Sequence, residues 1–325
     1  MVQNNFFYIA RSEFWPYFLK SKNAETLLKK NMKSSQKWII FNEYVQEIGI
    51  ETSAFCNRKC VYCPVSEYPR KQQFMDDQLY KKILEEMRQI DYKGIFTLSL
   101  FNEPLASKDI LNRIRLIKQY CPCSYVRMNS NGDYLTKDLL DELNEAGLNE
   151  ILITQHMDVN ETYSDEIAQE KIDAFFKRIG LTYTITKMKD MHNISCDLMY
   201  KKIKLLVVTN NWEEDGTDRG GKIEFLSGKK RNQPCCTPFR ELYIDVNGFV
   251  RFCFNIFVNE KNLGNVANHK VVDLFFSEEM VDIRRSHLNF GPKEWPCETC
   301  NTPDNALLES YEIREALLKK SINNN

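Results

Sequence analysis

The sequence predicts an α/β fold: a partial (β/α)6 barrel followed by a smaller domain that mixes helices and strands. Two observations support this fold class. First, between residues 47 and 209 short apolar runs alternate with segments of helical spacing, each about 10 to 15 residues long, as in βα units with a parallel sheet. Second, this alternation stops after Trp212, where cysteine-bearing loops surround a predicted hairpin.

The alternating region contains six predicted strands, at 47–53, 96–101, 125–129, 150–154, 183–187 and 203–209. Predicted helices lie between them at 76–90, 109–120, 136–146 and 166–179. Gly147 and Gly180 follow the last two helices, at the position where a glycine commonly ends a helix. Six such strands can close a partial or full barrel, with the reactive groups at their C-terminal ends.

The flanking regions complete the predicted domain organisation. Residues 1–45, aromatic and then lysine-rich, are predicted to form a helical arm, residues 46–215 the barrel and residues 216–325 the smaller domain. In this last part Asn247-Gly248 predicts a hairpin of strands 241–246 and 249–254. Helices are predicted near 271–286 and 306–320.

Composition excludes several classes of protein. The chain of 325 residues has 44 basic and 45 acidic side chains, so no net field indicates nucleic acid or an anionic membrane as a partner. We find no signal-peptide pattern and no run near the ~20 apolar residues of a membrane span, so a cytoplasmic location is expected. The 11 cysteines are an odd number in a chain that needs no disulfides to fold. They are therefore predicted to be reduced, with some of them binding metal.

The first cysteine cluster is the C-x3-C-x2-C group of Cys56, Cys60 and Cys63, in the loop after the first predicted strand. Structural zinc sites use four ligands, usually in two separated pairs. Three thiolates on one loop suit three irons of a 4Fe–4S cluster and leave the fourth iron open. Zinc and three ordinary buried thiols are the alternatives.

The second cluster combines Cys235 or Cys236 with Cys253, Cys297 and Cys300. Four ligands in two pairs can hold zinc or a second 4Fe–4S cluster. The spacing alone does not choose between the two metals.

The motif C-x3-C-x-aromatic-C, with Tyr62 as the aromatic residue, resembles the radical S-adenosylmethionine (radical SAM) superfamily. Three later predicted strand ends continue the resemblance with LFNEPL (100–105), NSNGDYLT (129–136) and ITQHMD (153–158), although Asn102 stands where the family usually has glycine. No adenine-binding element of the family is visible. The resemblance implies a TIM-like barrel in which the reduced catalytic 4Fe–4S cluster cleaves S-adenosylmethionine to a 5′-deoxyadenosyl radical. It also implies that the cofactor is bound by Tyr62, Asn102, Glu103, Ser130, Asn131, Gln155 and Arg219.

The C-terminal part resembles the auxiliary-cluster extension called SPASM, through C-x-x-P-aromatic, the hairpin, Leu263-Gly264-Asn265-Val266 and C-x-x-C. No cysteine follows Cys300, so the resemblance is to the shortened twitch form, with one auxiliary 4Fe–4S cluster. The C-x-x-P-F pattern selects Cys235 over Cys236. The implied ligands are Cys235, Cys253, Cys297 and Cys300.

The resemblance, to aminocyclitol dehydrogenases and aminoglycoside epimerases in particular, implies a radical SAM oxidoreductase. An auxiliary cluster is a natural acceptor for the electron of a substrate radical, which favours dehydrogenation of an alcohol on a sugar or aminocyclitol-like small molecule. His156 is the candidate acceptor of the hydroxyl proton, because histidine titrates near neutral pH. An external one-electron donor such as flavodoxin or ferredoxin is expected to reduce the catalytic cluster.

Three alternatives stay open. The first is an epimerase, in which Cys196 or Cys236 returns a hydrogen atom to the substrate. The second is a maturase of ribosomal peptides, for which the 45-residue arm is short as a leader-binding domain. The third is a non-catalytic iron–sulfur or zinc protein.

Overall fold

A single mixed sheet organises the molecule. The computed structural model describes residues 9–158, 160–228, 230–257, 261–302 and 311–322. Within them the strand order is β5-β6-β7-β4-β3-β2-β1-β8-β9. The strands are β1 Glu47–Ile50, β2 Ile95–Thr97, β3 Tyr125–Ser130, β4 Glu150–Thr154, β5 Lys187–Lys189, β6 Asn193–Tyr200, β7 Ile203–Asn210, β8 Glu241–Ile244 and β9 Val250–Arg251.

The six central strands, from β7 to β8, pair in parallel, whereas β5, β6 and β9 add to the edges in antiparallel pairs. The order is open, with β5 at one edge and β9 at the other, so the sheet forms a partial barrel. The prediction of an α/β fold with a parallel sheet is therefore confirmed.

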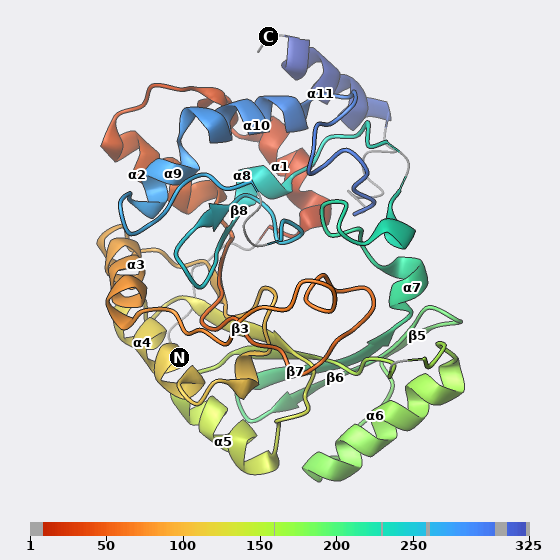
Figure 1. Cartoon of the computed structure of the whole chain (residues 1–325). Helices are drawn as coiled ribbons and strands as arrows, with labels where there is room; N and C mark the ends of the chain where they lie inside the picture. Colours follow the sequence, from red (N-terminus) through yellow and green to blue (C-terminus); the bar gives the residue numbers. More distant parts are fainter. Residues whose placement is uncertain (1–8, 159, 229, 258–260, 303–310, 323–325) are drawn as a thin grey trace.

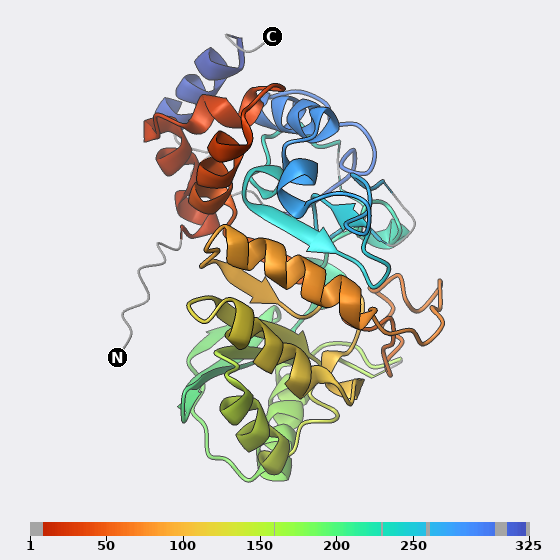
Figure 2. The ribbon, with the colours of Figure 1, turned by 90° about the vertical axis from the view of Figure 1, so that its left-hand side faces the viewer.

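Helices cover one face of this sheet. They are α3 Asp77–Gln89, α4 Ile110–Tyr120, α5 Lys137–Ala146 and α6 Asp165–Ile179. Figure 2 shows α3, α4 and α5 side by side along the sheet, with the arrowheads of β1 and β8 directed toward the side where the loop after β1 projects. The C-terminal ends of the parallel strands and the first cysteine cluster thus lie on the same side.

Local sequence signals explain where these helices begin and end. The Asp76 carboxylate accepts a hydrogen bond from the Leu79 amide (2.9 Å), and the Thr136 hydroxyl accepts one from the Leu139 amide (3.1 Å), so both residues cap helix N-termini. At the other end, Gly147 (φ 99°) adopts the left-handed conformation that stops α5.

Two expectations about strands were wrong. Residues 183–186 are not a strand; β5 begins only at Lys187, and the unpredicted β6 pairs antiparallel with both β5 and β7. Strand β6 escaped prediction because Asn193, Ser195 and Asp197 interrupt its apolar pattern. The sixth parallel strand is instead β8, which pairs with β1 from the C-terminal part of the chain.

The predicted helix at 271–286 is two helices, α9 Val271–Phe275 and α10 Glu278–Leu288. Ser277 separates them, and its hydroxyl accepts a hydrogen bond from the Met280 amide (3.2 Å) to cap α10. The last helix, α11 Tyr311–Ile322, overlaps the predicted one, whose first residues lie outside the described residues. Short elements complete the chain: α7 Trp212–Asp215, α8 Thr237–Arg240 and the 3-10 turns Pro104–Ala106 and Glu224–Leu226.

The N-terminal arm contains Arg11–Glu13 as a 3-10 turn, α1 Phe14–Lys20, the 3-10 turn Ala24–Leu28 and α2 Ser34–Tyr44. Its buried rings Phe14, Trp15 and Phe18 surround Phe239 of α8, with centroids 5.3 to 5.8 Å away. Figure 1 shows this arm beside the blue C-terminal helices. The arm therefore buries its aromatic face against the C-terminal part, and the three-part domain division stays a proposal.

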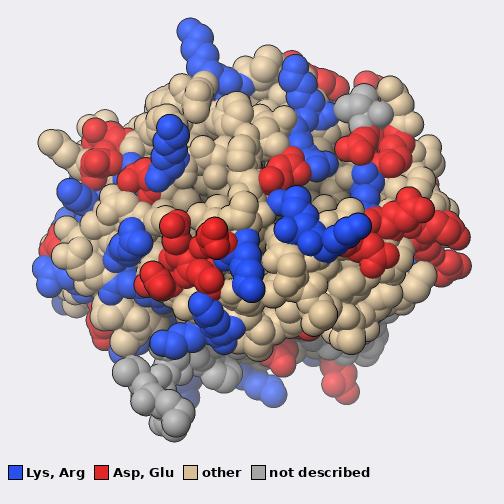
Figure 3. Space-filling view, turned by 90° about the horizontal axis from the view of Figure 1, so that it is seen from below, with Lys and Arg blue, Asp and Glu red and all other residues tan. Residues whose placement is uncertain are grey.

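The surface agrees with the balanced composition. On the face shown in Figure 3, basic and acidic side chains are interspersed. Among the described residues no helix is both long and apolar enough to cross a bilayer.

Candidate active site and auxiliary metal centre

The loop after β1 presents Cys56, Cys60 and Cys63 as half-buried free thiols. Short-range bonds shape the loop: the Cys63 amide donates to the Cys60 carbonyl (2.9 Å), and the Ser66 hydroxyl donates to the Cys63 carbonyl (2.7 Å). Burial raises the pKa of both Cys56 and Cys60 to about 11, and their neighbouring sulfurs add to the effect. Without metal these cysteines are therefore protonated, and a metal must displace their protons.

This donor set fits a cluster with one open iron, because three sulfurs share one loop at the C-terminal end of β1. Within the described ranges, no three Cys, His, Asp or Glu side chains converge on the position of a single ion.

Glu103 joins two other predicted cofactor residues, Ser130 and Asn131. Its carboxylate is buried and accepts hydrogen bonds from the Ser130 hydroxyl (2.7 Å), the Asn131 amide (2.7 Å) and the Leu105 amide (2.9 Å). Burial raises the pKa of Glu103, while these donors oppose the rise. The ends of β2 and β3 are thus tied together by one carboxylate, as expected for residues at neighbouring C-terminal ends of parallel strands.

Two further predicted cofactor residues lie at the same ends. Gln155 follows β4 and donates through Nε2 to the Asn131 carbonyl (3.1 Å). Asn102 accepts from the Leu100 amide (2.9 Å) and donates to the Ser53 hydroxyl (3.3 Å). The side chain that replaces the family's glycine therefore braces the loop internally.

An ion pair that the sequence analysis missed anchors the cysteine loop. Arg58 makes a bidentate contact with Asp133, at 2.6 and 2.7 Å, and Asn57 donates to the same carboxylate (2.7 Å). Asn131 in turn donates to the Asn57 side chain (2.8 Å). Opposite charges on two strand-end loops were the available signal, but sequence alone did not show that these loops meet.

Aromatic and basic side chains form one wall beside the cysteine loop. The Tyr62 hydroxyl lies 2.8 Å from Nδ1 of His156, and the Tyr62 ring lies 5.8 Å from the Trp212 ring. Burial lowers the pKa of His156 to about 4, and the positive charges of Arg58 and Arg219 contribute. Burial together with Cys60 raises the pKa of Tyr62. At neutral pH the imidazole is therefore uncharged and the phenol protonated.

The four implied auxiliary ligands line one cavity, together with Phe252, Phe254 and Asn255 among others. Cys253 and Cys297 are the more deeply placed thiols: burial raises the pKa of Cys253 well above its ordinary value and that of Cys297 to about 12. Cys235 faces this cavity, whereas Cys236 is fully buried at the N-terminal end of α8 and is not among the lining residues. This placement supports Cys235 as the ligand.

Hydrogen-bonding groups that no sequence pattern indicated lie beside three of these sulfurs. The Asn255 amide lies 3.4 Å from the Cys253 sulfur, Nε2 of His287 lies 3.3 Å from the Cys297 sulfur and Nη1 of Arg231 lies 3.9 Å from the Cys300 sulfur. The set of four cysteines in a polar, enclosed setting fits an iron–sulfur cluster.

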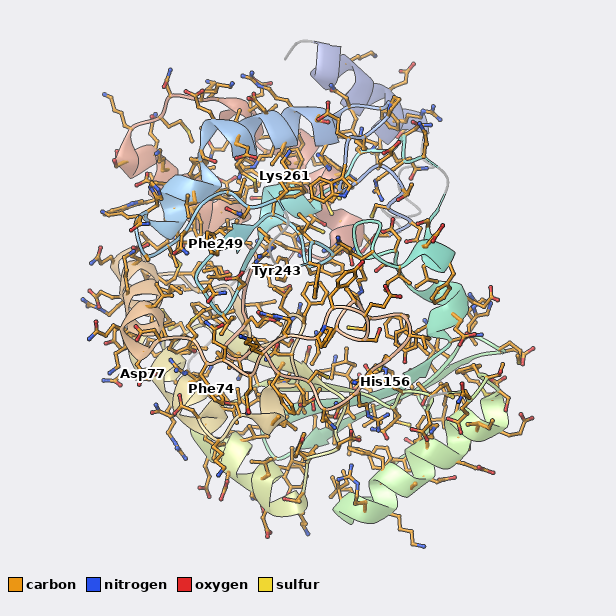
Figure 4. All side chains as sticks on the ribbon, in the orientation of Figure 1. Phe74, Asp77, His156, Tyr243, Phe249 and Lys261 are labelled. Atoms are coloured by element: carbon orange, nitrogen blue, oxygen red, sulfur yellow. The ribbon has the colours of Figure 1, made fainter. Side chains whose placement is uncertain are left out.

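Asn255 also links the auxiliary site to the segment 217–219. Its side-chain oxygen accepts from Nη1 of Arg219 (3.1 Å) and from the Thr217 hydroxyl (2.9 Å), while its backbone amide faces Cys253. In Figure 4, His156 lies in the lower half of the molecule, and Lys261, whose charge acts on Cys297, lies in the upper half. The segment 217–219 therefore contacts the auxiliary site through Asn255, and the charge of its Arg219 acts on His156 of the barrel.

Cys196 is not brought to this site. It lies in the middle of β6, paired with Val207 of β7, and is buried in the core near Asp173 of α6. The structure thus separates it from the strand ends where the other candidates gather.

Comparison with known proteins agrees with this geometry. Residues 50–210 match the model of the Radical SAM superfamily, and residues 235–301 match the SPASM model, an iron–sulfur cluster-binding domain. The chain is 26% identical over 269 residues to the S-adenosyl-L-methionine-dependent 2-deoxy-scyllo-inosamine dehydrogenase of Niallia circulans, covering 82% of this chain and 96% of that protein.

Solved structures show the same fold. The crystal structure of BtrN in complex with AdoMet and 2-DOIA is 23% identical and matches with a TM-score of 0.63 over 79% of this chain and 93% of that chain. BtrN in an open conformation, 22% identical, matches with a TM-score of 0.55 over 79% and 92%. These structures show the fold, and the two matched family models together with the dehydrogenase relative show the family: the chain is a radical SAM iron–sulfur enzyme, with its radical SAM domain over residues 50–210 and a SPASM-type domain over residues 235–301.

Proposed function

We propose that this enzyme dehydrogenates an alcohol on an aminocyclitol or sugar-like small molecule. The observation that supports the proposal is the Arg219–Asn255–Cys253 connection, which links the second cysteine site to an arginine whose charge acts on His156. Removing a hydrogen atom from a carbinol carbon leaves a radical that must lose one more electron and one proton to become a ketone. A nearby electron acceptor completes that oxidation. The similarity to a dehydrogenase of an aminocyclitol supports the same substrate class.

When bound, the catalytic cluster and S-adenosylmethionine supply the radical that removes the hydrogen atom. Cys56, Cys60 and Cys63 are the residues that would hold this cluster. We assign Glu103, Ser130 and Asn131 to the cofactor because they meet at the C-terminal ends of β2 and β3. The three hydrogen bonds of Glu103 fix the shape of this edge before any ligand binds.

The other wall is suited to a substrate with hydroxyl groups. The Nε of Arg219 and the Nε1 of Trp212 are buried donors with no hydrogen-bond partner in the described structure. Such donors cost free energy unless a ligand or water satisfies them. His156 is neutral at pH 7 and is a weak base, since its pKa is about 4. Its role as acceptor of the hydroxyl proton remains a prediction.

Anaerobic reconstitution tests the proposal. We expect eight irons per chain, two four-iron clusters, and 5′-deoxyadenosine on reduction in the presence of S-adenosylmethionine. The variant Cys297→Ala should lose the auxiliary irons and form little ketone while still cleaving the cofactor. Four irons in the unmodified protein would contradict the proposal.

The remaining partners follow from this chemistry. An external one-electron donor such as flavodoxin or ferredoxin must reduce the catalytic cluster. Cysteines that hold iron–sulfur clusters must be reduced, so we propose a reducing compartment such as the cytoplasm. The single auxiliary cluster of a twitch domain is part of the same proposal.

A further inference from the structure

Two buried basic side chains lie on the segments that surround the auxiliary site. Arg231 and Lys293 are 7% and 4% exposed, which is unusual for residues that normally project into water. Arg231 lines the same cavity as the four candidate cysteines. Its Nη1 lies 3.9 Å from the Cys300 sulfur, so one cation directly contacts a candidate ligand.

Backbone carbonyls hold both cations in place. Arg231 donates to the carbonyls of Thr302 (2.7 Å) and Pro234 (3.0 Å). Lys293 donates through Nζ to the carbonyls of Asn289 (2.7 Å) and Gly291 (2.9 Å). The Lys293 amide also donates to the Arg231 carbonyl (3.2 Å), which ties the two cation-bearing segments together.

Lys293 is electrostatically coupled to the cysteines. Burial, together with the charge of Arg231, lowers its pKa to about 8, whereas Cys235 and Cys297 act in the opposite direction. The buried carboxylate of Asp218 is the opposing charge near Cys297, and it accepts a hydrogen bond from the Thr299 hydroxyl (2.7 Å). The charges that act on these cysteines are therefore one carboxylate, Asp218, and four cations, of which Arg231 and Lys293 are the buried ones and Lys261 and Arg11 the others.

The effect of such charges on an iron–sulfur cluster has a definite sign. A cluster held by four thiolates is negative, and it becomes more negative when it accepts an electron. Fixed positive charge in a buried site stabilises the reduced form more than the oxidised form, because the low dielectric screens it little. Groups around the ligands thus set how readily the cluster accepts an electron.

We propose that Arg231 and Lys293 are positioning residues that raise the reduction potential of the auxiliary cluster, so that it accepts the electron released during substrate oxidation. This inference rests on the proposed function, because it assumes that the auxiliary cysteines bind a cluster. It goes beyond the proposed function by naming the residues of this chain that set the reduction potential of that cluster.

The test is a redox titration of the reconstituted enzyme, followed by electron paramagnetic resonance, with the iron content of every variant measured in parallel. Lys293→Met removes one buried charge, and Lys293→Arg keeps it. Lys230→Gln is the matched control, since Lys230 is 75% exposed and pairs with Glu298 beside the same cysteines. Water and salt screen a charge at that position.

We expect Lys293→Met to lower the equilibrium constant for reduction of the auxiliary cluster about tenfold, which is 59 mV for one electron. Lys293→Arg and Lys230→Gln should change it less than twofold. Arg231→Gln should shift the potential in the same direction as Lys293→Met, and Arg231→Lys should restore most of it.

An unchanged potential in Lys293→Met, with all auxiliary irons present, overturns the inference and leaves the proposed function intact. Four irons per chain in the unmodified enzyme overturns both. If Lys293→Met loads too little iron to titrate, Lys293→Gln, which keeps a donor for the carbonyls of Asn289 and Gly291, decides by the same criterion.

Discussion

Replacing Glu103 by glutamine tests whether one carboxylate organises the cofactor edge of the barrel. Its Oε1 accepts from the Ser130 hydroxyl and the Leu105 amide, and its Oε2 accepts from the Asn131 amide. A glutamine side chain has one oxygen and one NH2 group. In either orientation the NH2 group faces a backbone amide that is itself a donor.

The cost follows from these contacts. A hydrogen bond to a charged acceptor contributes about 1.5–3 kcal/mol, and a buried donor left without an acceptor costs about 1–3 kcal/mol. Because Glu103 is only 2% exposed, little water can replace the lost acceptor. We therefore expect a loss of about 3 kcal/mol in the free energy of unfolding. For a chain of this size, with about 2.1 cal/mol/K of unfolding entropy per residue, that corresponds to roughly 4 °C in Tm.

The assay is thermal unfolding of the cofactor-free protein at pH 8, well above the ordinary pKa range of a carboxyl group. Glu85→Gln is the matched control, because Glu85 pairs with Arg88 (2.6 Å) on the exposed face of α3. The Tm of this variant should equal that of the unmodified protein. If Glu103→Gln melts within about 1 °C of the unmodified protein, the three hydrogen bonds do not stabilise the cofactor edge as described, and this account is refuted.

Three further changes have defined outcomes. Burial lowers the pKa of Lys118 to about 8, so at this group the unfolded chain binds more protons than the folded chain between pH 8 and 10.5. Lys118 therefore adds a rise in stability with pH over this interval, and in denaturant titrations Lys118→Met should have a lower slope of stability against pH than the unmodified protein; an equal slope would contradict this. Phe239→Ala removes the ring at the centre of the aromatic cluster of the arm. It should lower the free energy of unfolding, measured with urea, by about 3–5 kcal/mol, and a loss below about 1 kcal/mol would show that the arm does not depend on this contact. Cys196→Ala should leave iron content and cofactor cleavage unchanged, because Cys196 lies away from both cysteine sites; loss of either would show that it acts there.

The sequence predicted those features that depend on local patterning. Helix α3 was visible because Asp76 caps it and its apolar residues recur at helical spacing. The meeting of Glu103 with Ser130 and Asn131 was also predictable, because neighbouring parallel strands end at the same edge of a sheet.

Features that depend on distant chain segments were not predictable. Strand β8 pairs with β1 although nearly two hundred residues separate them, and no local signal records that pairing. The bidentate contact between Arg58 and Asp133 and the approach of His287 to Cys297 have the same origin. Such contacts arise only when loops from separate elements meet.

The central claim, that the enzyme uses a radical to oxidise an alcohol, is tested most directly by isotope transfer. The fully reconstituted enzyme would be incubated anaerobically with S-adenosylmethionine and aminocyclitols, including 2-deoxy-scyllo-inosamine, deuterated at their carbinol carbons. The account predicts that deuterium moves from the alcohol into 5′-deoxyadenosine. It also predicts one molecule of ketone for each molecule of deuterated 5′-deoxyadenosine. Cofactor cleavage with no ketone from any of these alcohols, or an inverted alcohol that has taken hydrogen from solvent, would contradict it.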